Sequence, residues 1–141
     1  MTMQSLIDMA DVVKHELADR QEPIVDSGWT NASRCYYFRS GKGYYVLKWS
    51  KQMYRMVNFL PEFKGKGIGV TINKEYVDTL YDHQPHHQHT YLLFATPEGA
   101  GVYGMNLSDF VNKAAEHEQP ANGEVVYAIP IRMLDKWCGS V

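Results

Sequence analysis

The sequence predicts an α+β fold in which a mixed, mainly antiparallel sheet has three to four helices packed on it. Strand pairs of hairpin type and amphipathic helical segments are interspersed along the chain, a mixture typical of this class. The chain has 141 residues, of which 45% are hydrophobic and 21% charged, so it is long enough to bury a core without disulfides. We therefore expect a single domain over residues 1–141.

The first predicted element is an amphipathic helix that ends at about Arg20. Ser5 stands in an N-cap position, with Asp8 three residues further on as in a capping box. Pro23 follows the helix, and residues 24–25 are expected to be a short extended piece. The buried stripe of the helix is formed by apolar residues at helical spacing, namely Leu6, Met9, Ala10, Val13 and Leu17.

The clearest predicted element is a hairpin whose strands span residues 34–39 and 44–49, joined by the loop Ser40-Gly41-Lys42-Gly43. Symmetric closure puts Arg39 opposite Tyr44 and Tyr37 opposite Val46. One face is the more apolar and should point into the core; it carries Arg34, Tyr36, Phe38, Tyr45, Leu47 and Trp49. The other mixes cations with tyrosines and is predicted to be the exposed binding face; it carries Cys35, Tyr37, Arg39, Tyr44, Val46 and Lys48.

The remaining elements are predicted from local signals. Residues 51–66 are read as a turn and a half of helix that Pro61 stops. Asn73 is expected to cap a second helix. The other expected elements are a strand at 68–72, a loop at 82–89, a hairpin of strands 90–96 and 101–105, a third helix from Asn106 or Ser108 to about Glu116, a strand at 124–129, and a short terminal helix at 131–137 that Pro130 opens.

Charge is distributed unevenly along the chain. Residues 34–74 carry a formal charge of +8, whereas residues 1–33 carry −4 and residues 75–141 carry −6. Nine aromatic residues lie in the basic segment. Cations bind phosphate without reading sequence and aromatic faces stack on bases, so we expect a small, non-catalytic nucleic-acid-binding protein, for DNA or RNA. The predicted contacts are Tyr37, Arg39, Lys42, Tyr44, Lys48, Lys51, Arg55, Lys64 and Lys66.

An alternative function comes from Glu62-Phe63-Lys64. This is the E-x-K spacing, in which a carboxylate and a lysine on one strand face hold a divalent metal and position a phosphate. The second carboxylate that Mg²⁺ requires would be Asp26, since no Asp or Glu lies between residues 27 and 61. With the leading helix and the β-meander, the motif resembles the PD-(D/E)xK nuclease superfamily over the first half of the chain. That resemblance implies a Mg²⁺-dependent nuclease with Asp26, Glu62 and Lys64 as its catalytic residues.

The same family can be aligned in a second way, with residues 44–49 as the catalytic strand and Lys48 as its lysine. Val46 then occupies the position of the carboxylate, and the site would be inactive. Pro61 disfavours a central strand around Glu62, so an ordinary surface glutamate and lysine are the simpler interpretation of the first motif. The sequence thus favours a binding protein over an enzyme.

Metal binding is a second alternative. Four histidines fall within seven residues, at His83, His86, His87 and His89, and imidazole is a good zinc ligand. Pro85 prevents a regular helix there, which favours a solvated polar loop. The glycine-rich residues 65–69 match no phosphate-binding fingerprint and precede a strand, so they predict a turn and indicate no cofactor.

Location and partners are predicted from composition. The N-terminus lacks the basic region of a secretory signal, and no apolar run approaches the ~18 residues that span a bilayer, so no membrane contact is expected. The two distant cysteines, Cys35 and Cys138, allow a lone disulfide but favour reduced thiols in a cytoplasmic protein. The basic middle and acidic ends suggest a third class of function, in which the chain docks acidic proteins or forms a homo-oligomer through its own opposite charges.

Overall fold

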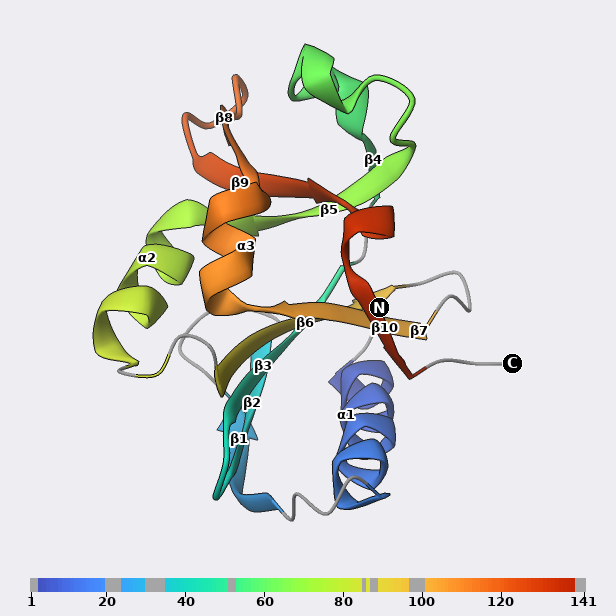
Figure 1. Ribbon diagram of the computed structural model, residues 1–141, viewed down its shortest axis with the longest axis vertical. Coiled ribbons are helices and arrows are strands. Elements are labelled where there is room, and N and C mark those ends of the chain that lie inside the picture. The colour runs from blue at the N-terminus through green and yellow to red at the C-terminus, as the bar shows by residue number, and fades with distance from the viewer. Residues whose placement is uncertain are drawn as a thin grey trace.

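The computed structural model describes residues 3–19, 24–29, 35–50, 53–84, 86, 89–96 and 101–138. These residues form the predicted α+β fold (Figure 1). The helices are α1 (Met3–Asp19), α2 (Lys74–His83) and α3 (Leu107–Lys113), and three 3-10 turns are η1 (Met56–Asn58), η2 (Pro61–Phe63) and η4 (Ile131–Met133). The strands are β1 (Ile24–Trp29), β2 (Cys35–Ser40), β3 (Tyr44–Trp49), β4 (Tyr54–Arg55), β5 (Ile68–Asn73), β6 (Thr90–Thr96), β7 (Gly101–Asn106), β8 (Ala115–Glu118), β9 (Val125–Pro130) and β10 (Asp135–Cys138).

The strands form two sheets. The large sheet has the order β1-β2-β3-β6-β7-β10, and the small sheet has the order β4-β5-β9-β8. Among the described residues, every strand pair is antiparallel except β3 with β6, which is parallel. A parallel pair requires the chain to cross over the sheet between its two strands, and this crossover contains β4, β5 and α2. The mixed, mainly antiparallel sheet is therefore confirmed.

Helix α1 covers one face of the large sheet. In Figure 1 it lies below β6 and β7, whereas α3 and the small sheet lie above them. Side chains alternate between the faces of a strand, so Tyr45 and Leu47 of β3 point to the α1 side. The core on this side consists of Ala10, Val13 and Leu17 from the helix, with Phe38, Tyr45, Leu47, Leu93, Ala95 and Val102 from the sheet. The predicted buried face of the hairpin is confirmed for Phe38, Tyr45 and Leu47.

A second core fills the space between the large sheet, the small sheet and helices α2 and α3. Val46 is fully buried in it, and Cys35 is 2% exposed. The prediction that this hairpin face is exposed is therefore wrong along most of its length. The second core combines Leu92, Phe94 and Met105 of the large sheet with Val70, Ile72, Tyr127 and Ile129 of the small sheet, together with Val77 and Leu80 of α2 and Leu107 and Phe110 of α3.

The hairpin register and the second helix follow the prediction. Arg39 pairs with Tyr44 and Tyr37 with Val46. Asn73 caps α2, since its side-chain oxygen accepts a hydrogen bond from the backbone N–H of Tyr76 at 2.8 Å. Strands β6 and β7 form the predicted antiparallel hairpin. None of the described helices is both long and apolar enough to cross a membrane.

Four local predictions are wrong. Helix α1 begins at Met3, so Ser5 lies inside it and is not its cap. Residues 53–63 form β4 and two separate 3-10 turns, and Pro61 begins the second of these. The third helix ends at Lys113, and residues 115–118 pair with β9 as a strand. The terminal helix is only the short turn η4, after which β10 pairs with β7.

Candidate nucleic-acid interface

The tip of the β2–β3 hairpin has a fixed shape. Its loop is closed by the backbone N–H of Ser40, which donates to the carbonyl oxygen of Gly43 at 2.9 Å. The Ser40 hydroxyl oxygen accepts from the N–H groups of Lys42 and Gly43, at 3.1 and 3.0 Å. The exposed side chain of Lys42 thus projects from a turn in which the amides of Ser40, Lys42 and Gly43 are hydrogen-bonded.

A groove of about 350 Å³ lies beside this tip and extends to the segment before β6. The hairpin tip and this segment lie close together, because a Cβ atom added to Gly43 would lie 2.9 Å from the carbonyl oxygen of His89. Only glycine fits there without displacing one of the two segments. The groove is lined by Arg39, Lys42, Tyr44, His86 and His89, among others, so two predicted cations and two histidines share it.

Tyr37 and Arg39 share the carboxylate of Asp26. The Tyr37 hydroxyl donates to Asp26 Oδ2 at 3.0 Å, and Arg39 Nη2 lies 3.8 Å from the same oxygen. The hydrogen bond to Asp26 raises the pKa of Tyr37 above its ordinary value. Tyr37 also stacks on Tyr44 with ring centroids 5.7 Å apart, and the pKa of Tyr44 is raised mainly by burial. Both tyrosines are consequently neutral at physiological pH.

Replacing Asp26 with asparagine should separate these two causes. We expect the pKa of Tyr37 to fall toward its usual value, because the carboxylate that holds its proton is gone. The pKa of Tyr44 should stay raised, because burial is its main cause. A tyrosine whose pKa is higher in the folded than in the unfolded protein contributes stability that is fully present below the unfolded-state pKa. That stability is lost as the pH rises through the folded-state pKa, so the effect of Asp26→Asn through this titration should appear only at alkaline pH. NMR titration of the tyrosine rings measures both pKa values, and an unchanged Tyr37 pKa would contradict the assignment.

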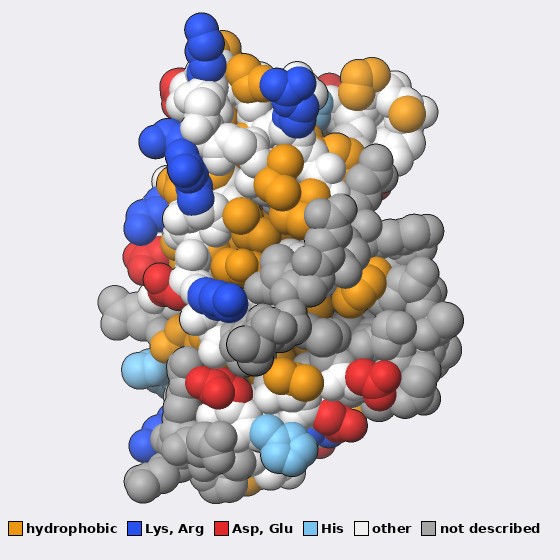
Figure 2. All heavy atoms as spheres, turned by 90° about the vertical axis from the view of Figure 1, so that its right-hand side faces the viewer, with side chains coloured by type: hydrophobic (Ala, Val, Ile, Leu, Met, Phe, Trp, Pro, Cys, Tyr) orange, Lys and Arg blue, Asp and Glu red, His pale blue; other side chains and the backbone are white. Residues whose placement is uncertain are grey.

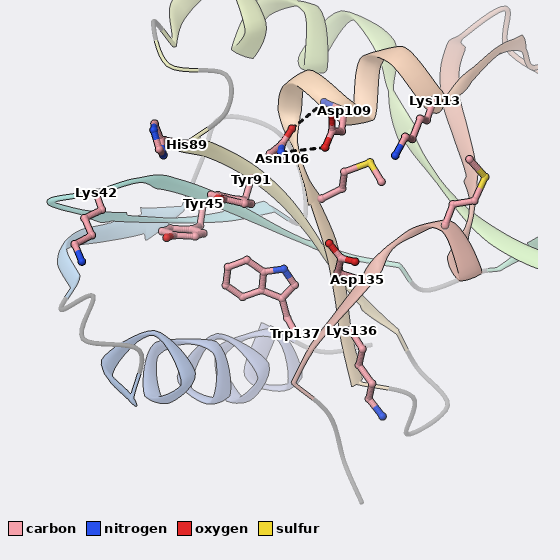
Figure 3. A pocket seen from close by; sticks show the side chains of 12 residues that line it. Lys42, Tyr45, His89, Tyr91, Asn106, Asp109, Lys113, Asp135, Lys136 and Trp137 are labelled. Carbon is pink, nitrogen blue, oxygen red and sulfur yellow. Dashed lines mark hydrogen bonds between the residues drawn. The ribbon is translucent and has the colours of Figure 1, made fainter.

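Next to the groove is a larger cleft, of about 820 Å³, which we call the aromatic cleft. Residues of β3, β6, β7, α3 and β10 line it, and Figure 3 shows the labelled side chains from these elements around it. Lys42 and His89 line both the groove and the cleft, so the two hollows are adjacent. The cleft is lined by Lys42, Tyr45, His89, Tyr91, Met105, Asn106, Asp109, Lys113, Met133, Asp135, Lys136 and Trp137.

Three aromatic rings meet in the aromatic cleft. Tyr45 and Tyr91 are register partners on β3 and β6, and their rings stack with centroids 5.2 Å apart. Trp137 packs edge-on against both, at 5.6 Å from Tyr45 and 5.5 Å from Tyr91. The β7–β10 pairing is irregular between Lys136 and Cys138, and such a bulge re-aims the side chain it contains. Tyr45 is 1% exposed, whereas Tyr91 and Trp137 are half-buried and present ring surface to the cleft.

Three lysines line the margins of the cleft. Figure 3 shows Lys42 and Lys113 at two sides of the cleft and Lys136 next to Trp137 on β10, with the Lys136 side chain directed away from the three rings. All three are exposed, and within the described part of the chain none has a carboxylate within 4.0 Å. Of the two carboxylates in the cleft, Asp109 is engaged by Asn106 Nδ2 at 3.1 Å. The cleft therefore offers aromatic surface with three lysines at its edges that form no ion pair with a described residue, together with the carboxylates of Asp109 and Asp135.

The other predicted contact residues do not join this surface. Lys48 is half-buried and donates to the carbonyl oxygen of Thr71. Arg55, Lys64 and Lys66 are exposed, but they belong to the small-sheet end of the molecule, opposite the hairpin tip along its long axis (Figure 1). Lys51 lies outside the described residues. The +8 segment is thus divided between two ends of the protein.

The residues of the nuclease alternative are also separated. Glu62 lies in the 3-10 turn η2 and Lys64 directly follows it, so the two do not share a strand face. Asp26 lies on β1 of the large sheet, toward the opposite end in Figure 1. In the second alignment, Lys48 does lie on a central strand, between β2 and β6, but Val46 two residues earlier is a fully buried apolar side chain. Neither alignment assembles a carboxylate pair for Mg²⁺.

The histidines do not form a described metal centre either. His83 belongs to the last turn of α2, with its Nδ1 2.8 Å from the carbonyl oxygen of Thr79, whereas His86 and His89 line the groove. His87 lies outside the described residues. Among the described residues no group of three or more His, Cys, Asp or Glu side chains is placed to hold a metal ion.

Sequence reasoning missed the main aromatic residues of the cleft. Trp137 was expected in a terminal helix, and Tyr91 was one of several apolar residues in a predicted strand. Their proximity depends on the β3–β6 and β7–β10 pairings, which join segments far apart in the chain. No local pattern signals such an arrangement.

Comparison with known proteins gives a fold relationship. No protein-family model matches the chain, and neither does any curated protein. Among solved structures, the fold is similar to that of a nuclease from a fusselovirus, with a TM-score of 0.53. The two share 10% sequence identity, over 96% of this chain and 88% of that one. At that identity the similarity shows a shared α+β fold and nothing about the site.

Proposed function

We propose that this protein binds single-stranded nucleic acid without cleaving it, through the aromatic cleft and the adjoining hairpin tip. The observation that carries the proposal is the pair of half-buried rings, Tyr91 and Trp137, in a cleft bordered by exposed lysines. Unpaired bases stack on aromatic faces, and their phosphates are held by cations alongside. A duplex keeps its bases stacked on each other, so this combination favours a single strand.

The parts of the surface have distinct roles in this proposal. Tyr91 and Trp137 supply the stacking platform, and Tyr45 beneath them fixes its position through the ring contacts. Lys113 and Lys136 neutralise phosphates near the platform, and Lys42 continues the path onto the hairpin tip. Arg39, in the adjoining groove, adds a cation whose position is set by Asp26.

Binding without cleavage is supported by the composition of β3. A nuclease site of the kind considered above needs a carboxylate two residues before the strand lysine, and here that residue is the fully buried Val46. The carboxylate of Asp26 is held by Tyr37 and Arg39. The described residues thus do not assemble the carboxylate pair that either alignment requires. Metal-dependent cleavage of single-stranded DNA that disappears in Glu62→Gln would contradict this part of the proposal.

Replacing Tyr91 with leucine tests the platform. Leucine keeps apolar contact with the core but lacks a ring face, so we expect the binding free energy for a single-stranded oligonucleotide to weaken by about 1–3 kcal/mol. Tyr81→Leu is the matched control, since Tyr81 is also half-buried but lies on α2 outside the cleft. Fluorescence anisotropy measures both affinities. Equal affinities for the two variants would remove Tyr91 from the interface.

A further inference from the structure

A second basic surface lies at the opposite end of the molecule, on the small-sheet side. Arg55 of β4, Lys64 and Lys66 of the η2–β5 loop, and Arg132 of η4 are all exposed, and we call these four residues the basic end. Figure 2 shows Lys and Arg side chains gathered over the upper part of one face, which is the part that holds η2 and β4 in Figure 1. Within residues 53–68 the single carboxylate is Glu62. The basic end is therefore strongly cationic.

The loop that carries these cations is held in place by the small sheet. Arg132 Nη1 donates to the carbonyl oxygen of Gly65 at 3.2 Å, which joins η4 to the loop. The N–H of Met56 donates to the carbonyl oxygen of Gly67 at 2.9 Å, and Met56 itself is fully buried. Phe63, the last residue of η2, is 8% exposed and anchors the start of the loop in the core under the small sheet. The loop therefore presents its cations from a fixed frame.

The chemistry of the basic end differs from that of the aromatic cleft. Its neighbouring rings pack on one another: Tyr54 meets Phe59 edge-on at 5.9 Å, and Phe59 meets His117 at 4.8 Å. Cations on a rigid frame bind backbone phosphates by charge, and a duplex presents the higher density of these. Exposed cations on a turn and a short loop, outside the aromatic cleft, can reach the phosphates of paired nucleic acid, whose bases need not be accessible.

We propose that the basic end is a second, separate contact site that binds the phosphate backbone of double-stranded nucleic acid. With the proposed function it would let one protein hold two segments at once, a single strand at the aromatic cleft and a duplex at the other end. The single-strand half of this arrangement rests on the proposed function. The duplex half rests only on the basic end.

The test uses two charge-reversed variants and two probes, a single-stranded oligonucleotide and a blunt DNA duplex. We expect Lys64→Glu with Lys66→Glu to lower duplex affinity by roughly tenfold or more at ~50 mM salt, leaving single-strand affinity unchanged. The milder Lys64→Gln with Lys66→Gln should reduce the slope of log affinity against log salt for the duplex by about 1.8, since each lost phosphate contact removes ~0.9. The matched control, Lys113→Glu with Lys136→Glu, should show the opposite selectivity.

The outcomes separate the two proposals. Duplex affinity that survives in Lys64→Glu with Lys66→Glu, or that is lost only in the cleft variant, would overturn the second site. Wild type that retains duplex but no single strand would overturn the proposed function and support the second site. As a readout of both together, an immobilised single strand should capture labelled duplex only when wild-type protein is added, and either variant should abolish the capture.

Discussion

Replacing Tyr45 with alanine should lower the free energy of unfolding by about 3–5 kcal/mol, the cost typical of deleting a large buried aromatic side chain. Tyr45 is 1% exposed and packs with Phe38, Leu47 and Leu93 against α1. It also supports Tyr91 and Trp137 from below, so its loss leaves a cavity under the aromatic cleft. The surrounding β strands are fixed by their pairing and can close only part of that space.

Tyr44→Ala is the comparison within the same strand. Tyr44 points to the other face and is half-buried near the hairpin tip, where it stacks on Tyr37. Its removal should cost less than the removal of Tyr45. Urea denaturation followed by circular dichroism measures both changes. A larger loss for Tyr44→Ala would mean that the two faces of the hairpin are reversed.

Reversing the three lysines of the aromatic cleft should have the largest effect on binding. In the triple variant Lys42→Glu, Lys113→Glu and Lys136→Glu, three phosphate contacts become repulsions. We expect single-strand affinity at ~50 mM salt to fall by roughly tenfold or more. The slope of log affinity against log salt should decrease in magnitude by about 2, because each lost phosphate contact removes ~0.7. Equilibrium titration over a salt series measures both quantities.

Two controls isolate charge from folding in this experiment. Lys64→Glu with Lys66→Glu also adds exposed negative charge, but at the basic end, and should leave single-strand affinity unchanged. Lys113 lies in the last turn of α3, where a cation is favourable, so its reversal should also cost about 0.3–1 kcal/mol of stability. A melting curve of the triple variant shows whether the fold is intact. Unchanged single-strand affinity in a folded triple variant would remove the cleft from the interface.

Elements specified by local chemistry were predictable from the sequence. Residues 40–43 close the hairpin in the register that their length and composition imply, and Asn73 caps α2 through its own side chain. Strand β6 carries a continuous apolar and β-branched run from Thr90 to Thr96. In each case the interaction that fixes the element lies within a few residues of it.

Elements specified by distant partners were not predictable in this way. Residues 115–118 have the polar composition of a helix end, yet they become β8 because β9 offers an edge for pairing. Residues 135–138 become β10 because β7 pairs with them, and local helical spacing could not reveal that partner. The prediction of which hairpin face is exposed was wrong for a related reason. The second face of the hairpin is buried because the small sheet, α2 and α3 fold back over it.

In the candidate site, too, residues close in sequence could be grouped from the sequence, whereas residues brought together by distant strand pairing could not. Tyr37, Arg39, Lys42 and Tyr44, four of the predicted contacts, are close in sequence and lie near one another at the hairpin. Lys48, on the same strand, is turned into the protein because Thr71 of the small sheet accepts its hydrogen bond. The ring platform of Tyr91 and Trp137 depends on pairings across the large sheet and was missed. Self-association through basic and acidic surfaces stays a prediction.

The central claim is that this chain binds single-stranded nucleic acid through exposed lysines beside an aromatic platform. The most direct measurement is a titration of the wild-type protein against single-stranded DNA and RNA of mixed sequence, over a salt series that starts at ~50 mM, where phosphate contacts are strongest. We predict saturable binding whose log affinity falls linearly with log salt, with a slope of at least about 2 for the three cleft lysines. No retention of either single strand at ~50 mM salt, or retention that does not change with salt, would contradict the claim.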